Sequence, residues 1–195
     1  DVEKVLEDFR SEPMNNIPEL YKVFFDHLTN NDLASYEYLL DWLSESLTKR
    51  NHTILCAIGD QGIGKGILGY IMSGLHGPKN YAKVRDSIFK ANFNAPLANK
   101  TLVYVDEAVL DTKESINRIK DVVNENIEVE KKGQDAQNLP NFASFYLSSN
   151  DFNAVKIEAK DRRFSIIDLT SIAIAECPEL LATLDSLLLP ENISG

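Results

Sequence analysis

The chain has 195 residues and a formal net charge of −10 at pH 7, and this length allows one sizeable hydrophobic core. No apolar run approaches the roughly 18 residues of a membrane helix and no signal peptide is visible, so we expect a cytoplasmic protein with no membrane partner. Cys56 and Cys177 have no framework or ligand spacing, which fits a reducing compartment and predicts no structural zinc. Because the chain begins at Asp1 rather than Met, we expect a fragment of a longer protein.

The negative charge is concentrated toward the two ends of the chain. Residues 1–50 contain 11 acidic and 5 basic side chains, and residues 176–195 contain 4 acidic and no basic ones. Residues 51–175 contain 15 of each. Nucleic acids bind to local positive charge, so the net acidity does not exclude such a partner for the neutral middle of the chain.

Residues 1–50 are predicted to be helical and to form a small subdomain. A helix should start near Asp32, its cap, and a shorter helix should follow Pro18. The longer helix has an apolar stripe at steps of three and four, formed by Leu33, Tyr36, Leu40, Leu43 and Leu47. Packing on the core is the simpler interpretation of this subdomain, and a role in oligomer contacts is the other.

The rest of the chain is divided into a core at residues 51–175 and a tail at residues 176–195. The tail is acidic and apolar and is predicted to form one amphipathic helix. Whether this helix packs on its own core or on a neighbouring subunit is open at this point.

A short, uncharged run at Thr53–Ile58 is typical of a strand that is covered on both faces. A glycine-rich loop and a helical pattern follow, so backbone N–H groups of the loop and of the helix start would face one anion. The loop meets the phosphate-binding pattern G-x-x-x-x-G-K at Gly59, Gly64 and Lys65. The predicted nucleotide-binding residues are Gly59, Asp60, Gln61, Gly62, Ile63, Gly64, Lys65, Gly66 and Ile67.

Gly66 departs from this pattern, which usually has Ser or Thr at that position. The missing hydroxyl normally binds Mg²⁺, so the metal would rely on carboxylates, on water or on the nucleotide alone. Lys65 would place its positive charge on the outer phosphates. The alternative is a glycine-rich turn that joins a strand to a helix and binds no ligand.

Residues 80–100 are predicted to mix short helical pieces with turns. A second buried strand at Thr101–Val105 then ends in Asp106 and Glu107, at the strand end where parallel sheets bind ligands. In a nucleotide site Asp106 would hold Mg²⁺, and Glu107 would orient the water that attacks the γ-phosphate. Alternatively, both acids face solvent.

A helix and a hairpin are predicted next. Asp111–Glu114 has the spacing of a capping box, and the following helix would bury Ile116, Ile119 and Val123. Ile127–Glu130 alternates as a half-buried strand should.

Lys131 and Lys132 begin a predicted turn, and after Pro140 the chain returns as Phe142–Asn150. Two lysines near the tip of a hairpin would suit a nucleic-acid backbone. From the charges alone, however, a solvated turn is the simpler interpretation.

Asn150 ends a third buried strand, at the same sheet edge as Asp106, where its amide would bond to the γ-phosphate or to the attacking water. Arg162 and Arg163 precede a further strand at Ser165–Leu169. Paired arginines are either ordinary surface charge or a finger that one subunit inserts into its neighbour's site to neutralise transition-state charge.

The order of these parts resembles the superfamily 3 helicases, the compact ATPases of viruses, phages and mobile elements. The likeness covers about Thr53–Leu169 and is particularly to the C-terminal domain of phage and poxvirus-type primase-helicases, where a Gly-Lys-Gly ending of the loop also occurs. It implies an α/β P-loop NTPase fold of the AAA+ type, in which helices flank a central, mainly parallel sheet and a small helical subdomain precedes it. It also implies a homo-hexameric ring that holds ATP and Mg²⁺ between subunits, passes DNA through its pore and works in the host cell cytoplasm.

The resemblance assigns roles to residues at the sheet edge. Asp106 would be the metal residue, Glu107 the water residue and Asn150 the sensor. The residues that cradle the phosphates would be Gly62, Gly64, Lys65 and Gly66.

It also assigns roles away from that edge. Lys131 and Lys132 match the hairpin that grips the DNA backbone. Arg162 or Arg163 matches the arginine finger, and both are kept. The helices of residues 1–50 resemble the collar through which such rings assemble, although no motif supports this. Catalytic roles are therefore expected for Lys65, Glu107, Asn150, Arg162 and Arg163.

The sequence thus predicts the motor domain of a replicative DNA helicase that acts on single-stranded or forked DNA and is linked to an N-terminal primase or polymerase domain. Three alternatives remain. In the first, the chain is an ATP-dependent initiator that melts an origin, or a loader. In the second, it is a weak nucleotide-binding oligomerisation module for the attached primase or polymerase. A small phosphotransferase is the third, which would need an acceptor pocket and a lid.

Overall fold

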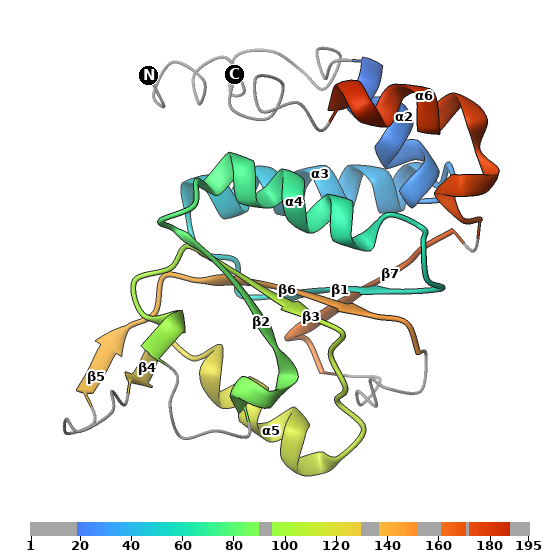
Figure 1. Ribbon diagram of the computed structural model, residues 1–195. Coiled ribbons are helices and arrows are strands. Elements are labelled where there is room, and N and C mark those ends of the chain that lie inside the picture. The colour runs from blue at the N-terminus through green and yellow to red at the C-terminus, as the bar shows by residue number, and fades with distance from the viewer. Residues whose placement is uncertain (1–18, 90–94, 130–136, 152–160, 171, 188–195) are drawn as a thin grey trace.

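The computed structural model describes residues 19–89, 95–129, 137–151, 161–170 and 172–187, and its core is a five-stranded sheet (Figure 1). Every neighbouring pair of strands in this sheet is parallel. The strand order is β2-β3-β6-β1-β7. The strands are β1 (Ile54–Ile58), β2 (Tyr81–Arg85), β3 (Leu102–Asp106), β6 (Ser144–Ser149) and β7 (Phe164–Asp168).

Helices cover both faces of the sheet, so the fold is the predicted α/β P-loop NTPase type (Figure 1). One face carries α2 (Glu19–Leu28), α3 (Leu33–Thr48), α4 (Lys65–His76) and α6 (Pro178–Leu187). The other carries α5 (Lys113–Val122). Three short 3-10 helices are η2 (Asp86–Phe89), η3 (Ala95–Leu97) and η4 (Ile174–Glu176).

Burial on both faces explains the continuous apolar runs in the strands. All residues of β1 and β6 are buried. Along β1, Leu55 and Ala57 pack toward α4, whereas Ile54, Cys56 and Ile58 pack toward α5. The predicted buried strands that end near Gly59, Asp106 and Asn150 are confirmed. A strand that is covered on both faces is apolar along nearly its whole length, which is why the sequence revealed these three.

Of the two N-terminal helices, α3 packs against β7 of the sheet, and α2 packs against α3 and α6. Asp32 caps α3 as predicted, and its carboxylate accepts a hydrogen bond from the Ser35 backbone N–H at 2.9 Å. Part of the predicted apolar stripe is wrong, because Leu33 is 67% exposed. The buried face of α3 is Tyr36, Leu39, Trp42, Leu43 and Ser46.

Trp42 explains why α3 buries a different face from the predicted apolar stripe. Its indole N–H donates to the Thr53 carbonyl at 3.1 Å, which turns the bulky ring toward the start of β1. The predicted C-terminal helix is α6, and its Leu180 and Leu184 are buried in the same core as α2 and α3. The described part of the tail therefore packs on its own chain. The domain boundaries at residues 50 and 175 stay a prediction.

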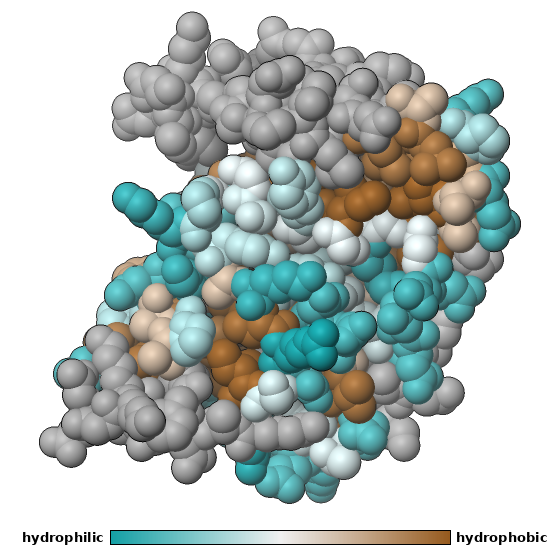
Figure 2. Space-filling view, in the orientation of Figure 1, coloured by the Kyte–Doolittle hydropathy of each residue, from teal (hydrophilic) through white to brown (hydrophobic). Residues whose placement is uncertain are grey.

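Strand β2 was not predicted, whereas the short helical pieces expected within residues 80–100 are confirmed as η2 and η3. Tyr81, Lys83 and Arg85 alternate with Ala82 and Val84, and β2 lies at the edge of the sheet, where only one side pairs. With only Ala82 and Val84 apolar, β2 is too short and too polar to form the continuous apolar run by which β1, β3 and β6 were predicted. Figure 2 shows hydrophilic surface gathered over β2 at the centre of the face that it displays.

The start of α5 lies one residue later than predicted. Thr112 is the cap, and its hydroxyl accepts from the Ser115 backbone N–H at 3.1 Å, so the capping box is Thr112 with Ser115 rather than Asp111 with Glu114. Ile116 and Ile119 are buried as predicted, and Val123 is half-buried.

A small antiparallel hairpin is formed by β4 (Asn126–Val129) and β5 (Gln137–Pro140). The predicted return strand, Phe142–Asn150, instead contributes β6 to the central sheet, and the partner of β4 comes before it. Lys131 and Lys132 lie outside the described residues. Across the described part of the chain, no helix is long and apolar enough to span a lipid bilayer.

Candidate functional site

Three adjacent strands bring the predicted loop and acids together at one edge of the sheet. Gly59 follows β1, Asp106 ends β3, and β6 lies between these two strands. Ile58 is in register with Ser149, and Val105 with Leu147. The carboxyl ends of parallel strands are where open α/β sheets bind ligands.

The backbone geometry at the start of α4 is suited to bind an anion. Gly62 and Gly64 have φ of 87° and 111°, a region that favours glycine. The first hydrogen bond of α4 runs from the Leu68 N–H to the Gly64 carbonyl at 3.0 Å. The N–H groups of Lys65 and Gly66 precede it and have no acceptor within the helix, so they attract negative charge.

Side chains from distant segments fix the shape of the loop. Ile63 is fully buried, and a Cβ added at Gly59 would lie 2.7 Å from its Cδ1 atom. A Cβ at Gly64 would lie 2.9 Å from Cε2 of Phe24, on α2, and 3.1 Å from Cδ1 of Ile174, on η4. The Ile174 N–H donates to the Gly62 carbonyl at 3.0 Å.

Lys65 is folded into the loop. Its ammonium donates to the carbonyls of Gly59 and Asp60, each at 2.6 Å, and its side chain is buried. Burial lowers the pKa of Lys65, and the charges of Asp60 and Asp106 oppose this shift. The Tyr146 hydroxyl donates to the Lys65 carbonyl at 3.0 Å, which ties the start of α4 to β6.

Asp106 lies in a network of four polar side chains. Its Oδ1 atom accepts from the hydroxyls of Tyr104, at 2.6 Å, and Ser148, at 3.1 Å. Its Oδ2 atom lies 2.7 Å from Nζ of Lys83. Burial raises the pKa of Asp106, but the bonds from Lys83, Tyr104 and Ser148 outweigh it and lower that pKa overall, so the carboxylate is ionised at neutral pH.

The ring of Tyr104 is held tightly beneath α4. It stacks on Tyr146 with centroids 4.8 Å apart, and a Cβ added at Gly69 would lie 2.6 Å from its Cε1 atom. Burial, reinforced by the bond to Asp106, raises the pKa of Tyr104, which therefore remains a hydrogen-bond donor.

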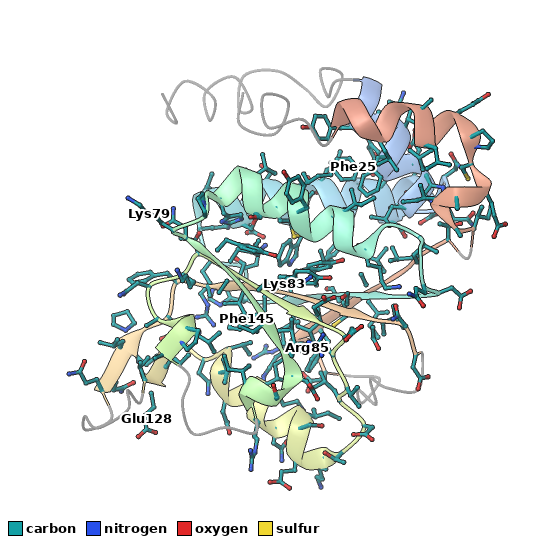
Figure 3. The ribbon with its side chains drawn as sticks, viewed as in Figure 1. Phe25, Lys79, Lys83, Arg85, Glu128 and Phe145 are labelled. Atoms are coloured by element: carbon teal, nitrogen blue, oxygen red, sulfur yellow. The ribbon has the colours of Figure 1, made fainter. Side chains whose placement is uncertain are left out.

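Sequence reasoning missed Tyr104, Ser148 and Lys83. Tyr104 comes two residues before Asp106 on one strand, so the period of two places both on the same face and offered a signal. Lys83 could not be found in this way because β2 had not been recognised. Figure 3 shows Lys83 and Arg85 along this strand.

Glu107 lies just beyond the end of β3, with its backbone in the left-handed region at φ 54°. Non-glycine residues rarely adopt this conformation, which costs on the order of 1 kcal/mol or more. The next residue anchors the turn, because the Ala108 N–H donates to the Ser148 carbonyl at 2.8 Å. The Glu107 carboxylate is exposed and lies 3.7 Å from the Arg85 guanidinium.

Asn150 and the two arginines lie at opposite ends of the sheet. Asn150 is exposed and directly follows β6, at the same edge as Asp106, as predicted. The Arg163 carbonyl accepts from the Ile54 N–H at 2.7 Å, at the start of β1. Arg162 and Arg163 are exposed and lie a whole strand length from Gly59, roughly 15 Å, so they cannot reach the loop of their own chain.

The site fits a nucleotide with Mg²⁺ by the chemistry of its donors. A Cβ added at Gly66 meets nothing within 4 Å, so that side of the loop is open. In the described ranges, no cluster of three or more His, Cys, Asp or Glu side chains is placed to hold a metal ion. One carboxylate, Asp106, with water and phosphate oxygens is nevertheless a normal environment for Mg²⁺.

Comparison with known proteins gives one family match and one curated relative. Residues 57–163 match the model described as Family of unknown function (DUF5906). The DNA Primase-polymerase of Nitratiruptor phage NrS-1 is 28% identical over 167 residues, covering 82% of this chain and 23% of that protein. The chain therefore spans about a quarter of the length of that relative.

Two solved structures share the fold. An apo structure of the NrS-1 C-terminal region has a TM-score of 0.79 and 25% identity, over 94% of this chain and 44% of that one. A JCV helicase has a TM-score of 0.56 and 16% identity, over 92% of this chain and 53% of that one, which shows the fold alone.

Proposed function

This chain belongs to the DUF5906 family, and we propose that it is an ATP-hydrolysing DNA helicase motor within a larger replication protein. One observation carries the proposal: β1, β6 and β3 bring the Lys65 loop and the ionised Asp106 to the same sheet edge. The likeness to a phage primase-polymerase, and to a structure of a viral helicase, supports it.

The loop would bind the phosphate chain of ATP. The free N–H groups at the start of α4 offer donors, and Lys65 would exchange its carbonyl acceptors for phosphate oxygens, which are charged and therefore stronger partners. Asp106 would hold Mg²⁺, which neutralises phosphate charge when it is bound. Its orientation is already set by Tyr104 and Ser148.

Glu107 would position and polarise the attacking water, and Asn150 would contact the γ-phosphate or that water. Both residues are exposed at the correct sheet edge, so substrate can reach them. The left-handed backbone of Glu107 supports this role, since strained residues gather at functional sites.

Arg162 or Arg163 would act on the site of a neighbouring subunit. Their position at the far end of the sheet excludes their own loop, and a head-to-tail ring, proposed as a homo-hexamer, would bring one subunit's arginine to the next subunit's phosphates. Lys131 and Lys132 would contact single-stranded or forked DNA in the pore. A primase or polymerase domain is proposed N-terminal to this chain in the intact protein.

The test is the ATP hydrolysis rate with and without single-stranded DNA, at several protein concentrations, beside Lys65→Ala. A rate that DNA stimulates, that rises faster than linearly with concentration and that is lost in the variant supports the inter-subunit motor. Strand displacement on forked DNA then separates a helicase from an initiator or loader, which would hydrolyse ATP without processive unwinding.

A second candidate is a nucleotide-binding oligomerisation module. It is favoured by Gly66, which removes a metal ligand, and by Lys83, which pairs with the Asp106 carboxylate. No hydrolysis at any concentration, together with retained nucleotide binding, would favour this function over the motor.

A further inference from the structure

Lys83 pairs with the one carboxylate that the proposed metal site offers. Its Nζ lies 2.7 Å from Oδ2 of Asp106 and 5.1 Å from the centre of the Tyr104 ring. The Tyr104 and Ser148 hydroxyls both donate to the other oxygen, Oδ1. The two carboxylate oxygens thus have different partners: Oδ1 accepts from two hydroxyls, and Oδ2 faces the Lys83 ammonium.

We propose that Lys83 is a tethered cation that occupies the metal-binding oxygen of Asp106 and exchanges with Mg²⁺ when nucleotide binds. Once displaced, its ammonium contacts the nucleotide phosphates as a further positive group of the site. This inference rests on the proposed nucleotide function and adds a residue to it.

The division of the carboxylate oxygens makes the exchange necessary. Oδ1 already has two hydroxyl donors, so a metal ion would bind Oδ2. An ammonium and a divalent cation repel each other strongly at a shared oxygen, and only one can remain there. Lys83 and Mg²⁺ therefore compete for the same atom.

The exposure of Lys83 makes the exchange easy. Its side chain is 54% exposed, so the ion pair is partly screened by solvent and weakly held. The side chain is long and flexible, so its ammonium can leave both the Asp106 carboxylate and the face of the Tyr104 ring.

Gly66 makes the competition matter for function. The usual loop hydroxyl would hold the metal beside Asp106, and Gly66 does not supply it. Metal affinity then depends on how readily Lys83 leaves Asp106. The displaced charge would compensate near the phosphates for the missing metal ligand.

The first experiment measures the dissociation constant of Mn²⁺ alone, without nucleotide, by electron paramagnetic resonance. Lys83→Met keeps an unbranched side chain of similar length and removes the competing charge, so Mn²⁺ should bind about threefold or more tightly than to the unmodified chain. Lys83→Arg keeps the charge and should bind Mn²⁺ as the unmodified chain does. Asp106→Asn should lose the site.

Lys79→Met is the matched control, because this exposed lysine lies just before β2, at the end far from Arg85 (Figure 3). Its Mn²⁺ affinity should be unchanged. Equal affinities for Lys83→Met and the unmodified chain would overturn the exchange, and so would an equal gain in Lys79→Met.

The second experiment measures binding of a fluorescent ADP analogue across a Mg²⁺ titration and in EDTA. Lys83→Met should lower the Mg²⁺ concentration at the midpoint, yet weaken binding in EDTA, because the phosphates then face an unneutralised Asp106. If Lys83 had only a structural role, its replacement would weaken binding of the analogue both with Mg²⁺ and in EDTA. If no variant binds nucleotide but the Mn²⁺ difference holds, the proposed function falls while the competition at Asp106 stands.

Discussion

Two glycines of α4, three residues apart, have opposite surroundings. A Cβ at Gly66 would meet nothing within 4 Å, whereas one at Gly69 would lie 2.6 Å from the Tyr104 ring. That ring is fixed between Tyr146 and the carboxylate of Asp106, so it has no room to withdraw. Gly69 is thus a packing requirement of the site, and Gly66 is not.

Alanine at these two positions should therefore shift stability in opposite directions. Gly66→Ala should raise the free energy of unfolding by about 0.4–1 kcal/mol, because it restricts the unfolded chain and favours the helix. Gly69→Ala should lower it by about 1–3 kcal/mol through overpacking. Urea unfolding of both variants measures the difference, and a loss of stability at Gly66 would contradict the open space described there.

Glu107→Gln tests the proposed water residue. The side chain is exposed and its ion pair is with Arg85, so nucleotide binding should be retained while hydrolysis falls about 100-fold or more. Glu114→Gln, on the exposed face of α5, is the control and should hydrolyse normally. Turnover by Glu107→Gln near the unmodified rate would remove Glu107 from its assigned role.

At the scale of elements, His76 joins two helices and a strand. It ends α4, and its ring lies 3.1 Å from the Ser46 hydroxyl of α3 and 2.8 Å from the Thr101 hydroxyl before β3. Burial lowers the pKa of His76 to about 4. The imidazole is therefore neutral in the folded chain at physiological pH.

This burial predicts a loss of stability in mild acid. The unfolded chain takes up the His76 proton near pH 6.5, and the folded chain resists it down to about pH 4, so stability falls as pH falls through that window. The contribution is at most about 3 kcal/mol. Because carboxylates also titrate, the measurement is the difference between the unmodified chain and His76→Gln at pH 7 and pH 4.5. Parallel stability curves would contradict the prediction.

Elements with a full apolar signature could be predicted from the sequence, and those that depend on distant contacts could not. Burial on both faces leaves β1, β3 and β6 as readable runs, and the parallel sheet then places Gly59 and Asp106 at one edge. The polar edge strand β2 gave no such signal, so Lys83 was missed. The contact of Phe24 with Gly64 joins residues 40 apart, which no local pattern reveals.

At the scale of the whole molecule, the proposed arginine finger and the phosphate loop lie at opposite ends of one sheet. Each chain would then contribute its loop to one site and its arginines to the site of a neighbouring subunit. Lys65→Ala and the double variant Arg162→Ala/Arg163→Ala should each be inactive in ATP hydrolysis. Mixing them should restore part of the rate, because some interfaces then pair an intact loop with intact arginines.

The control for this mixing experiment combines Lys65→Ala with a triple variant that lacks Lys65 and both arginines. No interface in that mixture has a complete site, so no rate should return. Absence of recovery in the first mixture, with assembly intact, would mean that the arginines serve elsewhere on the surface.

The supports of Gly64 have a mechanical consequence. Phe24 on α2 and Ile174 on η4, 150 residues apart in the chain, occupy the space that a side chain at Gly64 would need, and α6, which follows η4, packs against α2. The two outer segments thus pack together on the loop that holds Gly64. A displacement of α6 would reach this loop without passing through the sheet, so if the loop binds nucleotide as proposed, the outer helices would be coupled to it.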